Sequence, residues 1–309
     1  MVRIAVIGVG HLGQHHARIL ADLPGARLAG VADIDRARAE AIAARHDTRA
    51  FTEAAALVGE ADAVTIAVPT DAHLAVARPF LERGIPVLVE KPLARSLAEA
   101  DEMIALAARH GAVLAVGHTE RFNPAVAAAR PHVTAPRFIE VHRLGAFPER
   151  SLDIDVVFDL MIHDLDVILS FQPGEVTSVE AVGVAVLTGR TDIANARLRF
   201  ASGCIANLTA SRISRDRVRK IRFFQPDAYF SIDYAAQELE MWRLVRGDGP
   251  RPRIEGGPVT IPHEEPLKRE LADFVDAVRE RRAPLVGGAD GRAALALATE
   301  IARRMESVA

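Results

Sequence analysis

The sequence predicts two domains of different class: an α/β domain with a doubly wound parallel sheet, then an α+β domain with a large, mostly antiparallel open sheet. Three observations carry this prediction. An apolar run near the N-terminus leads directly into closely spaced glycines, short apolar strands then alternate with helices, and from residue 176 to 245 strands follow one another with almost no helix. A chain of 309 residues, half of them apolar, can bury two cores, and we expect domains at 1–120 and 121–309.

The N-terminal glycines predict a turn that binds a dinucleotide. Residues 2–7 form an apolar strand, and residues 14–23 continue as a helix. Between them lie Gly8, Gly10 and Gly13, at the spacing G-x-G-x-x-G. The first glycine allows the tight turn, the second lets the backbone approach a pyrophosphate, and the third lets helix and strand pack closely. The N–H groups at the start of the helix then suit the pyrophosphate.

A carboxylate follows where the adenosine ribose would lie. Residues 27–32 form a second apolar strand that ends at Asp33, about twenty residues after the last glycine. Asp33 is therefore expected to accept hydrogen bonds from the ribose, although aspartate at this junction is also a common helix N-cap. As a ribose ligand it would repel a 2′-phosphate, which predicts NAD rather than NADP. Arg36, one turn into the next helix, could instead reach such a phosphate.

The rest of the first domain alternates strand and helix, which predicts a Rossmann-type sheet covered on both faces. The cofactor crevice of such a sheet lies at the carboxyl ends of its strands, where Thr70 and the Glu90-Lys91-Pro92 segment are found. Helices are expected at 35–46, 52–58, 72–83 and 96–110, and strands at 63–68, 87–89 and 112–116.

Lys91 stands directly after a predicted buried strand, between Glu90 and Pro92, and the proline turns the chain into the crevice. Its position alone leaves a surface lysine almost as good an interpretation. Together, the glycine turn, Asp33, the segment 67–73 and Glu90-Lys91-Pro92 resemble the Gfo/Idh/MocA family of sugar and polyol oxidoreductases. The resemblance extends through the whole chain. It implies that the lysine holds the reacting hydroxyl beside the nicotinamide, and that the cofactor contacts Gly8, Gly10, His11, Leu12, Gly13, Asp33, Thr70, His73, Glu90 and Lys91.

The second domain is predicted to be rich in strands. A broad open sheet leaves one face for other contacts, and the resemblance implies that this face joins subunits in a homodimer or homotetramer. Strands are expected at 138–143, 176–187, 192–200, 204–213, 218–225, 228–234 and 238–245; helices at 124–131, 267–281 and 292–307; and a Pro/Gly-rich loop at 247–266.

One predicted helix, 155–171, is apolar on almost every side but carries Asp155, Asp159 and His163 at i, i+4 and i+8, with Asp166 one turn further. Such a line faces either water or a site. The resemblance matches Asp159-Leu-Met-Ile-His163 to the family's Asp-x-x-x-His element and implies that both residues are catalytic. A histidine can accept the proton of a secondary alcohol near neutral pH, and the aspartate can orient it or bind a neighbouring hydroxyl. The lysine would stabilise the developing negative charge.

The substrate prediction rests on the resemblance. Within the family, the segments 117–124, 152–163 and 219–230 most resemble the bacterial branch that oxidises the 3-hydroxyl of UDP-N-acetylglucosamine. A diphosphate is well matched by arginine, and the candidates are Arg121, Arg143 and Arg212, with Asn123 also expected at the substrate. For the segment 117–124, a domain-crossing loop capped by Asn123 is nearly as good an interpretation. A polyol or free-sugar dehydrogenase, an NAD-dependent glycosidase and a non-catalytic dinucleotide-binding protein are the alternatives.

Composition narrows the partners. A net charge of −3 without a long basic cluster argues against nucleic acid or membrane as a partner, and no run reaches the ~18 apolar residues that cross a bilayer. The N-terminus enters the glycine turn too early for a signal peptide, and the single cysteine, Cys204, fits a reducing cytoplasm. The histidines form no recognisable metal-ligand set, so no metal is expected.

Overall fold

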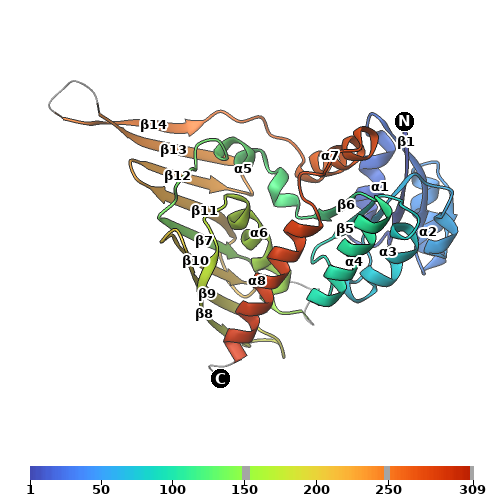
Figure 1. Ribbon diagram of the computed structural model, residues 1–309, viewed down its shortest axis with the longest axis horizontal. Coiled ribbons are helices and arrows are strands. Elements are labelled where there is room, and N and C mark those ends of the chain that lie inside the picture. Colours follow the sequence, from blue (N-terminus) through green and yellow to red (C-terminus); the bar gives the residue numbers. More distant parts are fainter. Residues whose placement is uncertain (148–153, 247–250, 307–309) are drawn as a thin grey trace. The chain divides into compact units, whose positions relative to one another are not determined.

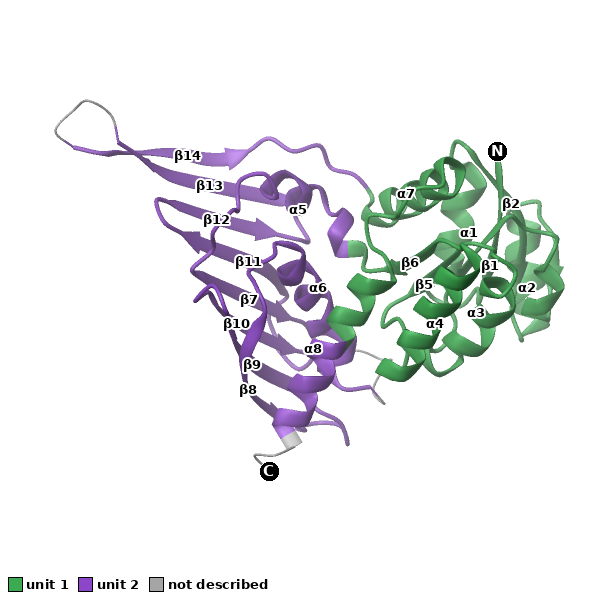
Figure 2. Ribbon diagram, viewed as in Figure 1, with its two compact units in different colours: residues 1–119, 265–295 green, residues 120–264, 296–309 purple. Residues whose placement is uncertain are grey.

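The computed structural model describes residues 1–147, 154–246 and 251–306. These residues form two compact units (Figure 2). The first unit contains residues 1–119 and 265–295, and the second contains residues 120–264 and the chain from residue 296. A segment near the C-terminus therefore belongs to the first unit, which a single division of the chain at residue 120 did not anticipate.

The first unit is built on a six-stranded parallel sheet with the order β3-β2-β1-β4-β5-β6, of which β1, β5 and β6 are labelled in Figure 1. This is the Rossmann order, so the predicted α/β class is confirmed. The strands are β1 (Val2–Ile7), β2 (Ala26–Ala32), β3 (Ala50–Phe51), β4 (Ala63–Ile66), β5 (Val87–Glu90) and β6 (Leu114–Gly117). The helices are α1 (Gly13–Asp22), α2 (Arg36–Arg45), α3 (His73–Leu81) and α4 (Leu97–His110), with 3₁₀ turns η1 (Ala54–Leu57) and η2 (Thr70–Ala72).

The ends of α4 show how local sequence sets these elements. The Ser96 side chain accepts a hydrogen bond from the Glu99 N–H at 3.3 Å and so caps the first turn. Gly111, with φ of 68°, takes the left-handed conformation that ends the helix. Two features of this unit differ from prediction: the expected helix 52–58 is only the 3₁₀ turn η1, and the two-residue strand β3 was not anticipated.

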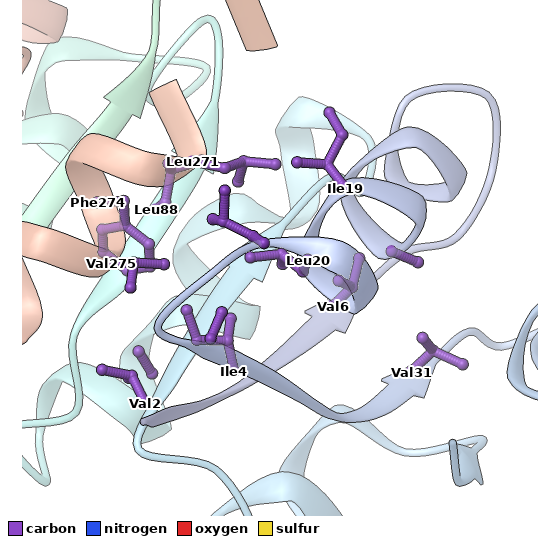
Figure 3. Close-up of a cluster of buried hydrophobic side chains, with 14 of the residues drawn as sticks. Val2, Ile4, Val6, Ile19, Leu20, Val31, Leu88, Leu271, Phe274 and Val275 are labelled. Carbon is purple, nitrogen blue, oxygen red and sulfur yellow. The ribbon is translucent and has the colours of Figure 1, made fainter. Parts of the chain in front are cut away.

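The core of the first unit joins its two chain segments. Side chains of β1 and α1, such as Ile4 and Leu20, pack with Leu271, Phe274 and Val275 of the helix α7 (Pro266–Glu280) (Figure 3). All of these are at most 1% exposed. Because α7 covers apolar surface of the parallel sheet, the segment from residue 265 is part of this unit's core.

The second unit contains an eight-stranded sheet with the order β14-β13-β12-β11-β7-β10-β9-β8. Only the β7–β10 pairing is parallel, so the predicted mostly antiparallel sheet is confirmed. The strands are β7 (Phe138–Leu144), β8 (Val176–Val184), β9 (Ile193–Phe200), β10 (Ile205–Ser211), β11 (Val218–Gln225), β12 (Ala228–Asp233), β13 (Glu238–Val245) and β14 (Arg253–Val259). The helical elements are η3 (Thr119–Phe122), α5 (Pro124–Ala129), η4 (Val157–Met161), α6 (Ile162–Ser170) and, starting in the first unit, α8 (Gly288–Glu306).

Strand β9 shows the alternation expected of a sheet with one wet face. Ala194, Ala196 and Leu198 are buried, whereas Asn195 and Arg197 between them are exposed. The buried face is covered by helices, since α5 packs on β12 and β13, and η4 packs on β10. The helical segment η4–α6 is therefore held on the inner face of the sheet.

The expected loop at 247–266 is wrong in its middle part, because β14 lies there and pairs with β13. Its Gly256-Gly257-Pro258 sequence hides the alternation typical of a strand. Gly256 and Gly257 have φ of 136° and 144°, a backbone that favours glycine, and proline is tolerated in a strand at the edge of a sheet. Residues 247–250 lie outside the described residues.

Candidate nucleotide pocket and catalytic helix

A pocket of about 480 Å³ lies in the first unit, where the carboxyl ends of β1, β2 and β4 meet. Its lining includes glycine backbone, the apolar side chains of Ile34 and Val76, and the charged groups of Asp33 and Arg38. In a sheet of this strand order, the crevice beside β1 is the usual place for a nucleotide. The apolar wall suits an adenine ring, and the charged groups suit a ribose.

The three glycines of the turn have the properties that a pyrophosphate site requires. A Cβ on Gly8, whose φ is 81°, would lie 2.7 Å from the Ala67 carbonyl oxygen, and a Cβ on Gly13 would lie 1.7 Å from the Gly8 carbonyl oxygen. A Cβ on Gly10 would instead meet no heavy atom of the described chain within 4 Å. The helix α1 has no side-chain cap and no acidic residue in its first turn. The turn is thus compact on the protein side and open where an anion can approach.

Asp33 sits at the end of β2 with 8% of its surface exposed. Its two carboxylate oxygens accept hydrogen bonds from the N–H groups of Val9 and Asp35, each at 2.9 Å. The N-cap of α2 is Asp35, which accepts from the Arg38 N–H at 3.1 Å, so helix capping does not explain Asp33. The carboxylate therefore faces the glycine turn.

The arginine at this pocket is Arg38, whose Nη1 lies 3.3 Å from a carboxylate oxygen of Asp33. Sequence reasoning singled out Arg36 instead, but that side chain is exposed and lies 3.7 Å from Glu40. Both arginines are in the first turns of α2, and a helix turns by 100° per residue, so only the structure distinguishes them.

The turn after β5 carries Lys91, and the preceding residue, Glu90, ties this turn to α1. His16, on α1 and fully buried, places Nε2 3.1 Å from one oxygen of Glu90. The other oxygen of Glu90 accepts from the Lys91 N–H at 3.3 Å. Lys91 itself is half-buried. The expected cofactor ligand Glu90 is thus only 6% exposed and links α1 to the lysine turn.

His73 lies between two loops at the same edge of the sheet and contacts both. Its Nδ1 lies 3.1 Å from the Pro92 carbonyl oxygen, and its Nε2 lies 3.0 Å from the Val68 carbonyl oxygen. Burial lowers the pKa of His73 despite these carbonyls, so the ring is neutral near pH 7. With 1% of its surface exposed, His73 holds the loop after β4 to the lysine turn, whereas Thr70, His11 and Leu12 stand closer to solvent.

The predicted helix 155–171 forms, but its first turn is a π-helix, η4, followed by α6. Asp159 lies in η4 and His163 in the first turn of α6, and both are half-buried. A π turn changes the angular spacing of residues, so a uniform period of 3.6 does not describe this segment. Asp166, within α6, is buried and does not extend the half-buried line of Asp159 and His163. Turns of this kind are frequent at functional sites.

Arg143 of β7 binds α6 through Asp164, the residue that follows His163. It donates to both carboxylate oxygens of Asp164, at 2.6 and 3.0 Å, and to Glu120 at 3.1 Å. Burial alone would lower the pKa of Arg143, but the two carboxylates raise it, so the guanidinium stays charged. The same guanidinium stacks over the ring of Tyr234, 5.1 Å from its centroid.

The other two candidate arginines are also paired with carboxylates. Arg121 donates to Asp166 of α6 at 3.2 Å, and Arg212 donates to Asp192 at 2.9 Å. Their side chains are only 6% and 2% exposed. A direct contact between these arginines and a substrate diphosphate stays a prediction, and it would require the diphosphate to displace a buried carboxylate.

Asn123 has the capping role that was the alternative interpretation of its segment. Its side-chain oxygen accepts from the Ala125 N–H at 3.1 Å, and its Nδ2 donates to the Tyr234 carbonyl at 3.0 Å. The side chain is almost fully buried. Substrate contact by Asn123 also stays a prediction.

Across the described parts of the chain, no helix combines the length and apolar character needed to span a bilayer. Within those same residues, histidine, cysteine and acidic side chains do not gather in groups of three that could hold a metal ion.

Comparison with known proteins identifies the family. The profile of an oxidoreductase family with an NAD-binding Rossmann fold matches residues 2–118, and that of the Gfo/Idh/MocA C-terminal domain matches residues 132–226. The chain belongs to the Gfo/Idh/MocA oxidoreductase family. The resemblance first drawn from the glycine turn and the lysine motif is thereby confirmed.

Individual Gfo/Idh/MocA relatives differ in how much of the chain they match. UDP-N-acetylglucosamine 3-dehydrogenase of Acidithiobacillus ferrooxidans is 41% identical over 99% of this chain and 98% of its own length. Its solved structure superposes with a TM-score of 0.93 at 40% identity, covering 99% of this chain and 98% of that one. Inositol 2-dehydrogenase of Rhizobium meliloti is 28% identical over 98% of this chain and 96% of its own, and scyllo-inositol 2-dehydrogenase (NAD(+)) of Bacillus subtilis is 32% identical over 69% and 68%.

Family membership supports NAD(P) binding by the Rossmann sheet of the first unit, where the pocket lies. Of the predicted cofactor residues, Gly8, Gly10 and Asp33 line that pocket, and Gly13 supports the turn. Sequence reasoning missed Arg38 and His16. The only signal for the histidine was its place in an otherwise apolar position of α1, which also fits a packing role.

Proposed function

We propose that this Gfo/Idh/MocA enzyme oxidises the 3-hydroxyl of UDP-N-acetylglucosamine with NAD, giving the 3-keto sugar nucleotide, NADH and a proton. The observation that carries the proposal is the 41% identity with a UDP-N-acetylglucosamine 3-dehydrogenase over 99% of the chain. The inositol dehydrogenases match less closely or over a shorter part of the chain.

The pocket of the first unit supports NAD over NADP. NAD, when bound, supplies the hydride acceptor. The open side of Gly10 and the N-terminus of α1 suit its pyrophosphate, and the buried carboxylate of Asp33 suits an unmodified ribose. Arg38 lies against that carboxylate, so its charge is already balanced in the absence of a 2′-phosphate.

We assign the proton transfer to His163 and the hydroxyl contact to Lys91. Both assignments rest on the resemblance of Glu90-Lys91-Pro92 and of Asp159-Leu-Met-Ile-His163 to the family's motifs, and both side chains are half-buried. Lys91 and His163 lie in the two segments that the family profiles match. An alcohol must lose its O–H proton as hydride leaves carbon, and an imidazole is suited to accept that proton. The lysine ammonium would stabilise the negative charge that develops on the oxygen. Asp159, four residues before the histidine, would orient it or bind a neighbouring hydroxyl.

We further propose that the protein works in the cytoplasm as a homodimer or homotetramer joined through the open sheet. Val182 and Val184 of β8 are each 50% exposed, which gives that edge of the sheet an apolar surface suited to a subunit contact.

The test is a comparison of substrates with purified protein, following NADH by absorbance. UDP-N-acetylglucosamine should reduce NAD much faster than myo-inositol, glucose or free N-acetylglucosamine. Faster turnover of myo-inositol would show that the substrate is a polyol and not the sugar nucleotide. Sugar release from UDP-N-acetylglucosamine without net NADH would instead indicate a glycosidase that uses NAD only transiently.

A further inference from the structure

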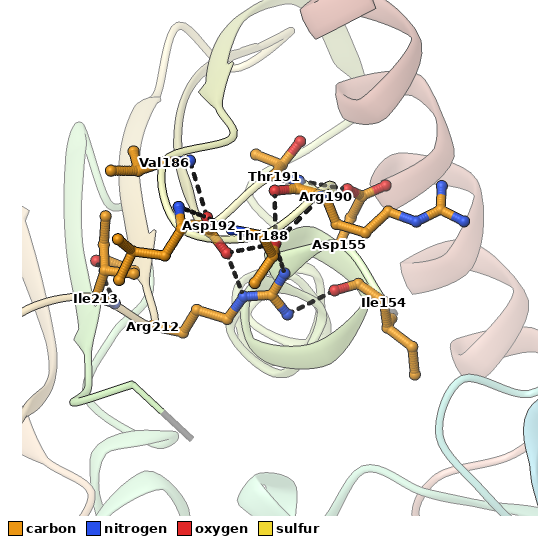
Figure 4. Close-up of polar contacts among 11 residues, drawn as sticks. Ile154, Asp155, Val186, Thr188, Arg190, Thr191, Asp192, Arg212 and Ile213 are labelled. Carbon is orange, nitrogen blue, oxygen red and sulfur yellow. Dashed lines mark hydrogen bonds and ion pairs between the residues drawn. The ribbon is translucent and has the colours of Figure 1, made fainter. Parts of the chain in front are cut away.

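Arg212 belongs to a buried network at the start of the catalytic helix (Figure 4). Its Nε donates to the Asp192 carboxylate at 2.9 Å, its Nη1 to the Ile154 carbonyl at 2.6 Å, and its Nη2 to the Thr188 hydroxyl at 3.2 Å. Each of the three guanidinium nitrogens thus has a partner within the protein. With the side chain 2% exposed, the guanidinium is turned inward.

Asp192 organises the loop 186–192, which lies between β8 and β9. Its carboxylate accepts from the N–H groups of Val186, Leu187 and Thr188, at 2.8, 2.6 and 2.9 Å. Burial alone would raise the pKa of Asp192, but these N–H groups and Arg212 outweigh it and hold the pKa well below its ordinary value. The carboxylate is therefore charged, and the loop is wound around a fixed ion pair.

The end of this loop is bonded to the residues that precede η4. The Thr191 N–H donates to the Asp155 side chain at 2.8 Å, and the Thr191 carbonyl accepts from the Val156 N–H at 3.1 Å. The first turn of η4 has no side-chain cap, so this reciprocal pair replaces one. Asp155 in turn accepts, through its carbonyl, from the Asp159 N–H at 3.1 Å.

We propose that Arg212 and Asp192 form a positioning latch for the catalytic helix, and that Arg212 does not bind the substrate diphosphate. The ion pair fixes the loop 186–192, the loop fixes Asp155 and Val156, and these set the π turn that carries Asp159 and leads to His163. Because a π turn is rare within a helix and this one has no side-chain cap of its own, outside contacts of this kind hold it in place. The proposal rests on the proposed function, since it concerns the same reaction.

The experiment compares Arg212→Lys and Thr188→Val with the control Arg222→Lys. Lysine cannot reach three separated acceptors at once. Thr188→Val removes the hydroxyl that joins Asp192 to Arg212, which also bonds to the backbone of Arg190 in the same loop. Arg222 makes a 2.6 Å ion pair with Glu140 on the same sheet, so it controls for the loss of an arginine–carboxylate pair. The smaller Thr188→Val change gives a folded variant if Arg212→Lys does not fold.

The latch predicts a fall in kcat with little change in substrate binding. For Arg212→Lys, kcat should fall about 10- to 100-fold, a loss typical of misplaced catalytic groups, while the KM for UDP-N-acetylglucosamine and the inhibition constant of UDP change less than about threefold. Thr188→Val should show a smaller loss of the same kind, and Arg222→Lys none. A tenfold rise in KM and in the UDP inhibition constant at unchanged kcat would overturn the latch and make Arg212 a diphosphate ligand.

A readout without substrate separates the two proposals. Amide hydrogen exchange of the peptide covering residues 156–165 should be faster in Arg212→Lys and Thr188→Val than in the wild type, and unchanged in Arg222→Lys. If the wild type does not oxidise UDP-N-acetylglucosamine, the proposed function fails, but this exchange result still supports the latch. Unchanged exchange in both latch variants would overturn it.

Discussion

Replacing Asp33 with asparagine should move the cofactor preference from NAD towards NADP. The two carboxylate oxygens accept from the Val9 and Asp35 N–H groups, and the amide of asparagine offers only one acceptor oxygen. The ribose then loses a charged acceptor. A hydrogen bond to a charged group contributes about 1.5–3 kcal/mol, so the Kd for NAD should rise about 10- to 150-fold.

The same change should help NADP. Loss of the carboxylate charge removes the repulsion of a 2′-phosphate. It also leaves Arg38, which lies 3.3 Å from both Asp33 and Asp35, with one carboxylate partner in place of two, so the guanidinium is more available to that phosphate. Isothermal titration calorimetry with both cofactors measures the two Kd values directly. The matched control is Glu40→Gln, which loses an exposed carboxylate of the same helix α2, 3.7 Å from Arg36. An unchanged ratio of the two Kd values in Asp33→Asn, or an equal change in the control, would refute this account of the pocket.

Two further predictions concern catalysis and pH. Lys91→Ala and His163→Ala should each lower kcat by about 10² or more while NAD binding stays near that of the wild type, and near-normal turnover in either variant, judged against the exposed control Lys268→Ala, would remove that residue from the mechanism. Burial lowers the pKa of His73, so the unfolded chain takes up the proton first as the pH falls below about 6.5; the stability that the neutral ring contributes is complete above that pH and is lost below it. The difference in Tm between the wild type and His73→Gln should therefore be larger at about pH 8 than at about pH 5, and a difference that grows towards acid pH would contradict the neutral ring.

The fold could be predicted wherever the local pattern and the tertiary environment agree. Strands of the parallel sheet are buried on both faces and read as short apolar runs, and caps such as Ser96 and Gly111 mark the helix ends. β14 could not be predicted in this way, because Gly256-Gly257-Pro258 lacks the side-chain alternation of a strand and its pairing with β13 is a tertiary contact. The return of α7 to the first unit is likewise decided by packing.

The sequence predicted which residues lie at the candidate site more successfully than it predicted what each of them contacts. Motif spacing selected Asp33 from the sequence alone. The structure places its carboxylate against the glycine turn, where it accepts from the Val9 N–H. For the arginines, the sequence shows where a positive charge lies but not which carboxylate pairs with it. Arg143 and Arg212 were predicted to bind phosphate, and in the structure each pairs with a carboxylate 21 or 20 residues away in the chain, Asp164 or Asp192. Such buried pairs depend on which strands and helices meet, and no local pattern encodes that.

The proposed function depends on one step, the transfer of hydride from C3 of UDP-N-acetylglucosamine to NAD. The direct measurement uses UDP-N-acetylglucosamine carrying deuterium at C3, with mass spectrometry of the reduced cofactor and of the sugar nucleotide after one incubation. Hydride transfer from C3 predicts that the NADH carries the deuterium and that the oxidised sugar nucleotide, now a ketone at C3, has lost the deuterium. Unlabelled NADH, or deuterium retained in the oxidised sugar, would contradict it.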